Sequence, residues 1–210
     1  VLRSASNLEK FNKQIKFAKK NKSTVACLIE RGTLEEIKKK ENNNDHYKLN
    51  KELFLKNLIE SLKKNTKIIS STGYNSRELM YLRKKYKFKN SSDFYMIGGM
   101  GHTASVALGY SLTNKSNTVC VDGDGSILMH LGSIKTVGNF ANNNFKYVLL
   151  NNNCHDSVGG QTTFSKNINF RQLSKSLGFK KYYMINKSKN LRKIIKKFLS
   201  EKNLSFLEAR

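Results

Sequence analysis

The chain has 210 residues, enough for one complete domain with a buried core and a piece of another. Its formal net charge of +24 is compatible with nucleic-acid binding. The lysines, however, are scattered over expected helix faces, usually beside asparagine, so nucleic acid is not an expected partner and a basic nucleic-acid-binding module stays only an alternative. No apolar run approaches the roughly 20 residues that span a bilayer, and no signal peptide is visible. We therefore expect a cytoplasmic protein without a membrane partner.

The three cysteines are an odd number without metal-like spacing, which argues against a disulfide framework or a zinc site. Cys27 and Cys120 lie in apolar, strand-like runs and are expected as small core residues. The chain begins with Val1 rather than Met and ends in an apolar stretch, so we treat it as a fragment that is open at both ends.

The first 34 residues are predicted to form a helix and a strand. Apolar residues recur with helical spacing from Leu8 to Ala18, and the apolar, β-branched run 24–30 is typical of a buried strand. Residues 35–48 are charged and rich in asparagine, which predicts a linker. The main domain is then expected over residues 49–210.

From residue 49 onward, helical and strand patterns alternate. The expected helices are 50–64, 76–86, 102–113, 127–140, 168–177 and 189–201, and the expected strands are 67–71, 94–97, 117–122, 145–150, 181–185 and 204–208. This alternation predicts an α/β fold with a doubly wound, mostly parallel sheet covered by helices on both faces. Ligands of such sheets bind at the carboxyl ends of the strands, so the chemistry is expected in the loops that follow the strands.

One of these loops has the sequence Asp122-Gly123-Asp124-Gly125-Ser126, between a strand and an apolar helix. Glycines on both sides of a carboxylate let the backbone approach a phosphate closely, and free N–H groups at a helix start favour an anion. Asp124 would hold a metal ion that bridges to the phosphates. Alone, Gly-Asp-Gly is weak evidence, because turns use the same residues for conformational reasons.

The next strand ends in Asn151-Asn152-Asn153, after the spacer 126–150. One helix and one strand fill this spacer, and a right-handed crossover returns the asparagines to the sheet edge beside Asp124. Carboxylate and amide oxygens are ligands suited to Mg²⁺, which takes its remaining ligands from water and phosphates.

Gly-Asp-Gly followed at this distance by Asn-Asn resembles the cofactor motif of the thiamine-diphosphate-dependent decarboxylases and their relatives. The resemblance implies that the Asp124 and Asn152 side chains and the main-chain carbonyl of Cys154 bind Mg²⁺. It also implies that Gly123, Gly125 and Ser126 contact the diphosphate of the cofactor.

Two further loops resemble the family. In 97–102, Ile-Gly-Gly-Met-Gly-His, the resemblance implies that the carbonyl of Gly98 accepts a hydrogen bond from the cofactor amine and that Met100 props the two rings into a V shape. In 70–76, the loop with Thr72, Gly73 and Asn75 is implied to touch the diphosphate, although small hydroxyl residues there are equally ordinary helix caps.

Within the family, the sequences around these motifs most resemble the phosphonopyruvate decarboxylases, with sulfopyruvate decarboxylases close behind. The implied reaction is the non-oxidative decarboxylation of 3-phosphonopyruvate to phosphonoacetaldehyde and CO₂, a step of phosphonate biosynthesis. A sulfopyruvate decarboxylase and an acetolactate-synthase-like carboligase remain alternatives, because they would share every cofactor residue. His102, His155 and Gln161 are the catalytic candidates, since they lie on the loops expected nearest the reaction centre.

The resemblance also implies a partner. In this family, a glutamate of a pyrimidine-binding domain activates the cofactor, and residues 1–34 resemble only the C-terminal tail of such a domain. The positions of Glu9 and Glu30 do not resemble the context of that glutamate. We therefore expect the pyrimidine-binding domain of a second chain to complete the site, in a homo-oligomer that is at least a dimer.

Overall fold

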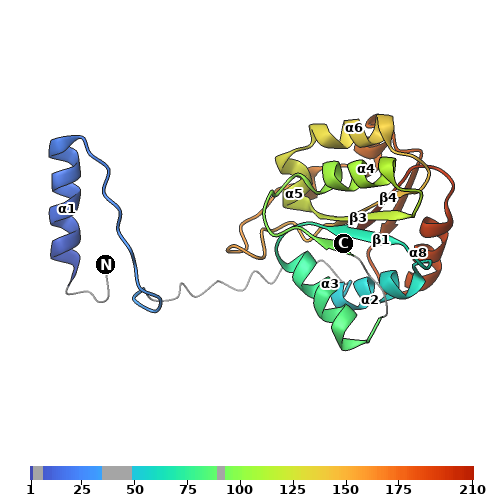
Figure 1. Ribbon diagram of the computed structural model, residues 1–210, viewed down its shortest axis with the longest axis horizontal. Coiled ribbons are helices and arrows are strands. Elements are labelled where there is room, and N and C mark those ends of the chain that lie inside the picture. The colour runs from blue at the N-terminus through green and yellow to red at the C-terminus, as the bar shows by residue number, and fades with distance from the viewer. Residues whose placement is uncertain (2–6, 35–48, 89–92) are drawn as a thin grey trace. The chain divides into compact units, whose positions relative to one another are not determined.

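The computed structural model describes residues 1, 7–34, 49–88 and 93–210 (Figure 1). The chain divides into two compact units, Val1–Asp45 and His46–Arg210. The predicted linker 35–48 lies outside the described residues, and the two units are considered separately below.

In the N-terminal unit, the predicted helix is confirmed as α1, Leu8–Asn21. The strand predicted over 24–30 is wrong: this run contains no regular strand, and Val25, Leu28 and Ile29 are exposed. Cys27 is exposed as well, which corrects the expectation of a core position. An apolar run becomes a buried strand only where a sheet receives it, and the described part of this unit contains no sheet.

The second unit is built on one parallel sheet, in the order β2-β1-β3-β4-β6-β5. Its strands are β1 Lys67–Ser70, β2 Phe94–Tyr95, β3 Thr118–Gly123, β4 Phe145–Leu150, β5 Lys181–Ile185 and β6 Ser205–Ala209. Every residue of β4 and β6 is buried, as expected of central strands that are covered on both faces.

Helices cover both faces of this sheet (Figure 1), which confirms the doubly wound fold. One face carries α2 Lys51–Ser61, α3 Tyr74–Lys85 and α8 Leu191–Ser200; the other carries α4 Thr103–Thr113, α5 Asp124–Met129, α6 Gly132–Phe140 and α7 Phe170–Ser176. Each face has its own apolar core, with Phe54, Leu79 and Phe198 on the first and Ala107 and Ile134 on the second.

The helix predicted over 127–140 is two helices. It starts earlier, at Asp124, and breaks at His130, whose backbone has the non-helical angles φ −140° and ψ 54°. The Ser133 hydroxyl donates to the His130 carbonyl at 2.8 Å and satisfies it where the helix stops. The break turns the chain between α5, which starts in the Gly-Asp-Gly loop, and α6 on the surface of the domain.

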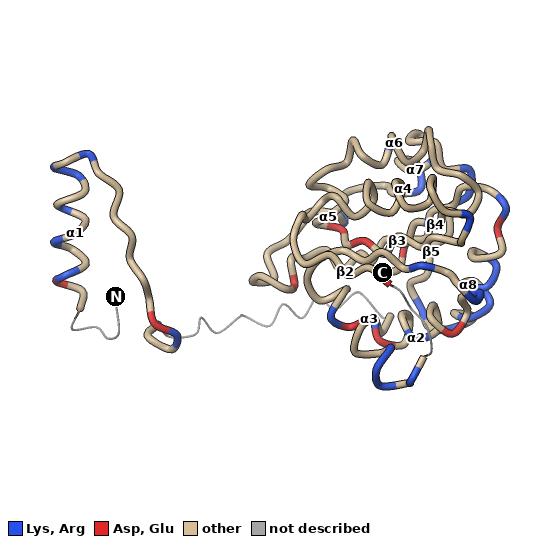
Figure 2. Tube along the Cα trace, viewed as in Figure 1, with Lys and Arg blue, Asp and Glu red and all other residues tan. Residues whose placement is uncertain are grey.

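Basic residues are spread along α1, α3 and α8 (Figure 2), as predicted from the sequence, where the lysines are scattered over helix faces. Within the described residues, no helix is long and apolar enough to cross a membrane.

Candidate active site

The carboxyl ends of the central strands lie side by side. Gly123 at the end of β3 pairs with Leu150 at the end of β4, and Leu150 pairs with Ala209 in β6. The segments that follow β3 and β4 begin with Asp124 and Asn151, so these two polar side chains enter the same edge of the sheet.

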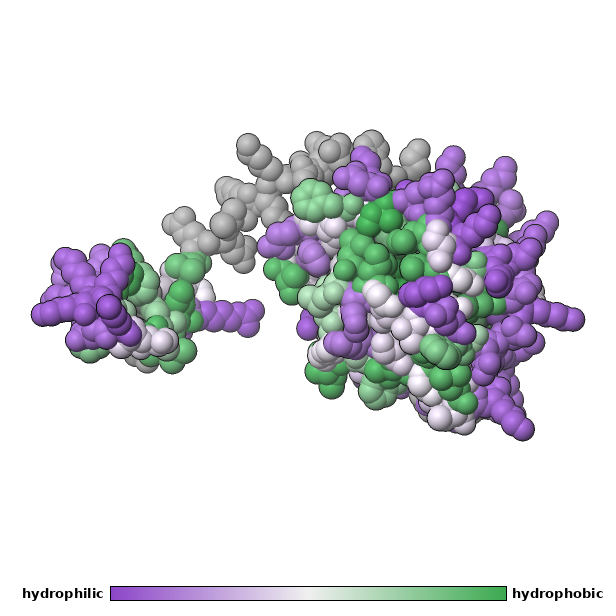
Figure 3. All heavy atoms as spheres, turned by 90° about the horizontal axis from the view of Figure 1, so that it is seen from above, coloured by the Kyte–Doolittle hydropathy of each residue, from purple (hydrophilic) through white to green (hydrophobic). Residues whose placement is uncertain are grey.

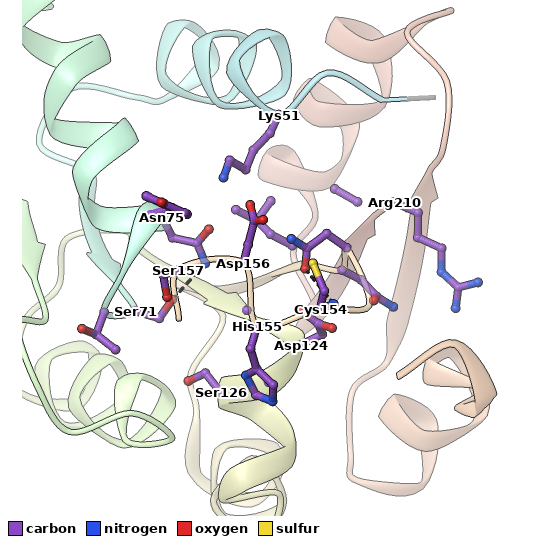
Figure 4. Close-up of a pocket in the computed structure, with 18 of the residues that line it drawn as sticks. Lys51, Ser71, Asn75, Asp124, Ser126, Cys154, His155, Asp156, Ser157 and Arg210 are labelled. Atoms are coloured by element: carbon purple, nitrogen blue, oxygen red, sulfur yellow. Dashed lines mark hydrogen bonds between the residues drawn. The ribbon is translucent and has the colours of Figure 1, made fainter. Parts of the chain in front are cut away.

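A pocket of about 140 Å³ opens at this edge (Figure 4). The residues predicted from sequence that line it are Thr72, Asn75, Met100, Gly123, Asp124, Gly125, Ser126, Asn152, Cys154 and His155. The lining also includes Lys51, Ser71, Asp156, Ser157 and Arg210. Loops that are far apart in sequence therefore meet around one cavity, and most of the predicted site residues belong to it.

Asp124 is almost fully buried, with 2% of its surface exposed. Its Oδ2 accepts hydrogen bonds from the hydroxyls of Thr163 and of Ser165, the latter at 2.9 Å. Burial raises the pKa of the Asp124 carboxyl, and these hydrogen bonds oppose the rise. Asp124 is therefore part of the buried interior of the domain and is not a surface-loop carboxylate. Thr163 and Ser165 were missed, because no motif marks them.

The loop of residues 151–153, which follows β4, is held by hydrogen bonds of its asparagine side chains. The exposed Asn152 accepts a hydrogen bond from the Cys154 backbone N–H at 3.3 Å, and Asn153 adopts a left-handed conformation with φ 58°. The side chain of Asn151 is buried and donates to Glu208 Oε1 at 2.7 Å. Asn152 therefore faces solvent at the pocket while its neighbour Asn151 anchors the loop inside the domain.

A second acid lies beneath the pocket floor. Asp122 is buried, and its carboxylate accepts hydrogen bonds from the Tyr147 hydroxyl at 2.8 Å and from the Gly123 N–H at 3.0 Å. Burial raises the pKa of both Asp122 and Tyr147. Asp122 does not line the pocket, so it supports the turn into Asp124 from below.

Gly125 leaves room for the His155 ring, which a side chain at position 125 would displace. A Cβ there would lie 2.5 Å from His155 Cε1 and 3.2 Å from Met100 Cε. Gly73 has a φ of +86°, and a Cβ there would lie 2.9 Å from the Ser157 hydroxyl oxygen. The segment that carries His155 and Ser157 thus packs directly against two of the predicted glycines.

This segment is a small hairpin in which Cys154 pairs with Thr162. The His155 N–H donates to the Gln161 carbonyl at 2.8 Å, which holds the hairpin together. The Gln161 side chain is exposed and lies outside the pocket, beside Gly159. Figure 4 shows His155 and Ser126 on one side of the cavity, with Lys51 and Asp156 on the other.

The loop after β2 reaches the pocket through Met100 alone. Gly98 is exposed, with no atom within 4 Å of a Cβ position, and does not line the cavity. The neighbouring Ile97 carbonyl accepts a hydrogen bond from the Thr72 hydroxyl at 2.8 Å, which ties this loop to the one after β1. The exposed His102 packs edge-on against His130, with ring centroids 4.9 Å apart, and also lies outside the pocket.

The charges of the pocket fit a diphosphate only together with a cation. Of the cationic lining residues, Lys51 pairs with Glu78 at 2.9 Å and Arg210 pairs with Glu208. The described residues contain no group of three His, Cys, Asp or Glu side chains that could hold a metal. A carboxylate, an amide and a main-chain carbonyl, completed by phosphate oxygens, are instead the donor set that Mg²⁺ takes.

The fold is that of the thiamine-pyrophosphate-binding domain of the thiamine pyrophosphate enzymes. The family model "Thiamine pyrophosphate enzyme, C-terminal TPP binding domain" matches residues 71–209, so the chain belongs to this family.

Among curated proteins, the chain is similar to phosphonopyruvate decarboxylase of Streptomyces viridochromogenes, with 40% identity over 126 residues, which are 60% of this chain and 30% of the relative. It is also similar to sulfopyruvate decarboxylase subunit beta of Methanocaldococcus jannaschii, with 35% identity over 125 residues, 59% of this chain and 64% of the relative. In both comparisons the chain spans less than two thirds of the relative's length.

Proposed function

We propose that this chain binds the diphosphate of thiamine diphosphate in a Mg²⁺-dependent decarboxylase of 2-oxo acids, with 3-phosphonopyruvate as substrate. The observation that carries the proposal is that Asp124 and Asn152, which follow β3 and β4, line the same pocket together with Gly123 and Gly125. Resemblance to enzymes of this chemistry supports it.

In the proposed complex, the Asp124 carboxylate, the Asn152 amide and the carbonyl of Cys154 hold Mg²⁺. Gly123, Gly125 and Ser126 are proposed to face the diphosphate. Their positions in the pocket lining support these roles. When bound, thiamine diphosphate supplies the carbon nucleophile and the electron sink that decarboxylation requires.

Other residues of the chain are proposed to orient and shield the reacting groups. Met100, which lies against Gly125, props the cofactor rings, and His155 closes the cavity from the hairpin side. His155 is the best placed of the catalytic candidates, since it alone lines the pocket. His102 and Gln161 stay proposals, and their exposed positions leave them available to a substrate held above the pocket.

The substrate is tested by assay. The complete enzyme is incubated with thiamine diphosphate, Mg²⁺ and, in parallel, 3-phosphonopyruvate, sulfopyruvate or pyruvate, and CO₂ release is measured. The proposal expects the highest kcat/KM with 3-phosphonopyruvate. A preference for sulfopyruvate would support the alternative favoured by the resemblance to sulfopyruvate decarboxylase subunits. Carbon–carbon ligation of pyruvate would indicate a carboligase.

We also propose that a pyrimidine-binding domain of a second chain completes the site, in an enzyme that is at least a dimer, and that residues 1–34 are the tail of such a domain. Exposed apolar side chains on α4, α5 and α6 support a partner surface, namely Val106, Leu112, Met129 and Phe140. Apolar patches are visible between the charged side chains on the side of the domain seen in Figure 3. Cys27 and Cys120 form no disulfide, which suits the reducing cytoplasm, where we place the enzyme.

The partner is tested by reconstitution. This chain alone, with cofactor, Mg²⁺ and 3-phosphonopyruvate, is expected to release no CO₂, because the activating glutamate is proposed to lie on the partner. Addition of a separately expressed pyrimidine-binding half restores turnover. Turnover by the chain alone would refute the assignment of the glutamate to a partner.

A further inference from the structure

Ser165 joins the two loops that carry the proposed metal ligands. Its side chain is fully buried, and its hydroxyl lies 2.9 Å from Asp124 Oδ2 and 2.7 Å from Asn151 Oδ1. Asn153 Oδ1 is 3.3 Å from the same hydroxyl and accepts the Lys166 N–H at 3.0 Å. A single hydroxyl therefore contacts both segments, the one that follows β3 and the one that follows β4.

Asn151 can hold Ser165 in place because Glu208 holds Asn151. The Asn151 amide donates to Glu208 Oε1 at 2.7 Å, and its backbone N–H donates to the Ala209 carbonyl at 2.8 Å. Glu208, on β6, is itself fully buried. A line of close polar contacts thus leads from β6 through Asn151 and Ser165 to Asp124, and the single Ser165 hydroxyl proton is shared between the Asn151 amide oxygen and the Asp124 carboxylate.

Glu208 is an unusual residue for the middle of a sheet. A buried carboxylate is costly unless charged or polar donors surround it. Here the donors are the Asn151 amide, the Tyr182 hydroxyl and the Arg210 guanidinium. The Arg210 side chain, which is 28% exposed, supplies the positive charge that opposes the Glu208 carboxylate. The carboxylate is therefore well satisfied, and its position is fixed from three directions.

The contacts also limit the motion of Asp124. The hydroxyls of Thr163 and Ser165 both approach Oδ2, so the plane of the carboxylate cannot turn without losing hydrogen bonds in a buried place. Mg²⁺ demands nearly ideal octahedral geometry at about 2.0–2.1 Å, whereas Ca²⁺ accepts irregular arrangements at longer distances. A carboxylate held in one orientation therefore matters more to Mg²⁺ than to Ca²⁺.

We propose that Ser165, Asn151 and Glu208 form a positioning bridge that holds the Asp124 carboxylate in the orientation required by Mg²⁺ and so determines which divalent cation the site prefers. The inference rests on the proposed function, because it takes Asp124 as a metal ligand. None of the three residues is a catalytic residue; they act through Asp124.

The test compares Ser165→Ala and Glu208→Gln with the control Ser174→Ala. Ser174 is also a buried serine, but its hydroxyl donates to the Arg171 carbonyl in α7 and does not touch the site. In the complete enzyme with thiamine diphosphate, the affinities for Mg²⁺ and Ca²⁺ are measured by titration calorimetry. The melting temperature of each metal-free variant is recorded alongside them.

Ser165→Ala and Glu208→Gln are expected to lower the Mg²⁺ affinity about 10-fold or more, the usual effect of removing an outer-shell partner, and the Ca²⁺ affinity by clearly less. Ser174→Ala leaves both affinities unchanged. Equal losses for both ions, or a lower melting temperature with unchanged affinities, would show a merely structural role and overturn the bridge. Wild-type enzyme that binds no divalent ion with the cofactor would refute the proposed function itself.

Discussion

The imidazole of His155 lies where a side chain at Gly125 would be, since a Cβ on residue 125 would come within 2.5 Å of Cε1 and 2.7 Å of Nδ1. The second glycine of the Gly-Asp-Gly motif therefore leaves room for the His155 ring in the ligand-free domain, in addition to its proposed contact with the diphosphate. A substitution at Gly125 can therefore act in two ways, by displacing the His155 ring and by weakening cofactor binding, and a second substitution at His155 distinguishes them.

Gly125→Ala is expected to lower the melting temperature and to weaken thiamine diphosphate binding, because the His155 ring must move. The double variant Gly125→Ala/His155→Ala removes the clash, so its melting temperature should exceed that of Gly125→Ala. Gly109→Ala is the control, since no atom lies within 4 Å of a Cβ there, and a helical Gly→Ala change is stabilising by about 0.4–1 kcal/mol. A double variant less stable than Gly125→Ala would refute the clash.

Substitutions of Asp124 are expected to separate its proposed role as a metal ligand from its structural role. Asp124→Asn keeps an acceptor for Thr163 and Ser165, so it should keep the fold but lose at least about tenfold in Mg²⁺ affinity, because the ligand charge is gone. Asp124→Ala should in addition cost about 1–3 kcal/mol of unfolding free energy, since buried hydroxyls lose their shared acceptor. Calorimetry and urea unfolding measure the two effects. Unchanged Mg²⁺ affinity in Asp124→Asn would remove Asp124 from the metal site.

The candidate site was predictable where short motifs coincide with strand ends. The pattern around Asp124 and Asn152 indicates both the residues and their placement, because parallel strands linked by one helix bring their carboxyl ends together. Ser165 and Glu208 could not be found this way. Each is an isolated polar residue whose partners are distant in sequence, and only the packed sheet brings them to Asp124.

The fold was predictable wherever apolar periodicity is strong. The prediction failed where contacts with residues distant in sequence determine the secondary structure. The run 24–30 has the composition of a buried strand, but a strand also needs a partner that local sequence cannot supply. The break at His130 went unpredicted because apolar residues continue on both sides of it, at Leu128 and Leu131. Hydrogen bonding to the His130 carbonyl, not hydropathy, sets this boundary.

Gly138 should be the least replaceable glycine in α6. A Cβ there would lie 1.7 Å from the Leu177 carbonyl oxygen, so Gly138→Ala must push α6 away from the turn after α7. We expect a loss of about 3 kcal/mol or more, as for severe overpacking. Gly132→Ala in the same helix meets no atom within 4 Å and should change stability by less than about 1 kcal/mol. Urea unfolding of both variants decides the matter, and equal stabilities would contradict the contact.

Lys146 is expected to make stability depend on pH. It is buried on β4, where its ammonium group donates to the carbonyls of Asn143 and Asn203 at 3.1 Å, and burial lowers its pKa from 10.5 to about 8. Between these pH values the unfolded chain binds a proton that the folded chain does not. Unfolding free energy due to Lys146 should therefore rise as the pH goes from about 8 to 10.5.

Lys146→Met removes this titrating group. Between pH 8 and 10.5, the unfolding free energy of the wild type should therefore rise relative to that of the variant. The exposed Lys135→Met variant serves as the control for loss of a lysine charge. A difference curve for Lys146→Met that is flat between pH 8 and 10.5 would contradict the lowered pKa.

The Asp124 side and the Met100 side of the pocket follow strands at different positions in the sheet. Asp124 and Asn152 follow β3 and β4 inside the sheet, whereas Met100 follows β2, a two-residue strand at the sheet's edge. Regions of low local stability open without global unfolding, and short edge strands are such regions. Amide hydrogen exchange should therefore be slowest in β3 and β4 and fast around Met100. The ligand-free domain would thus keep the Asp124 side of the pocket rigid, while the Met100 side would become ordered only when the pocket is occupied.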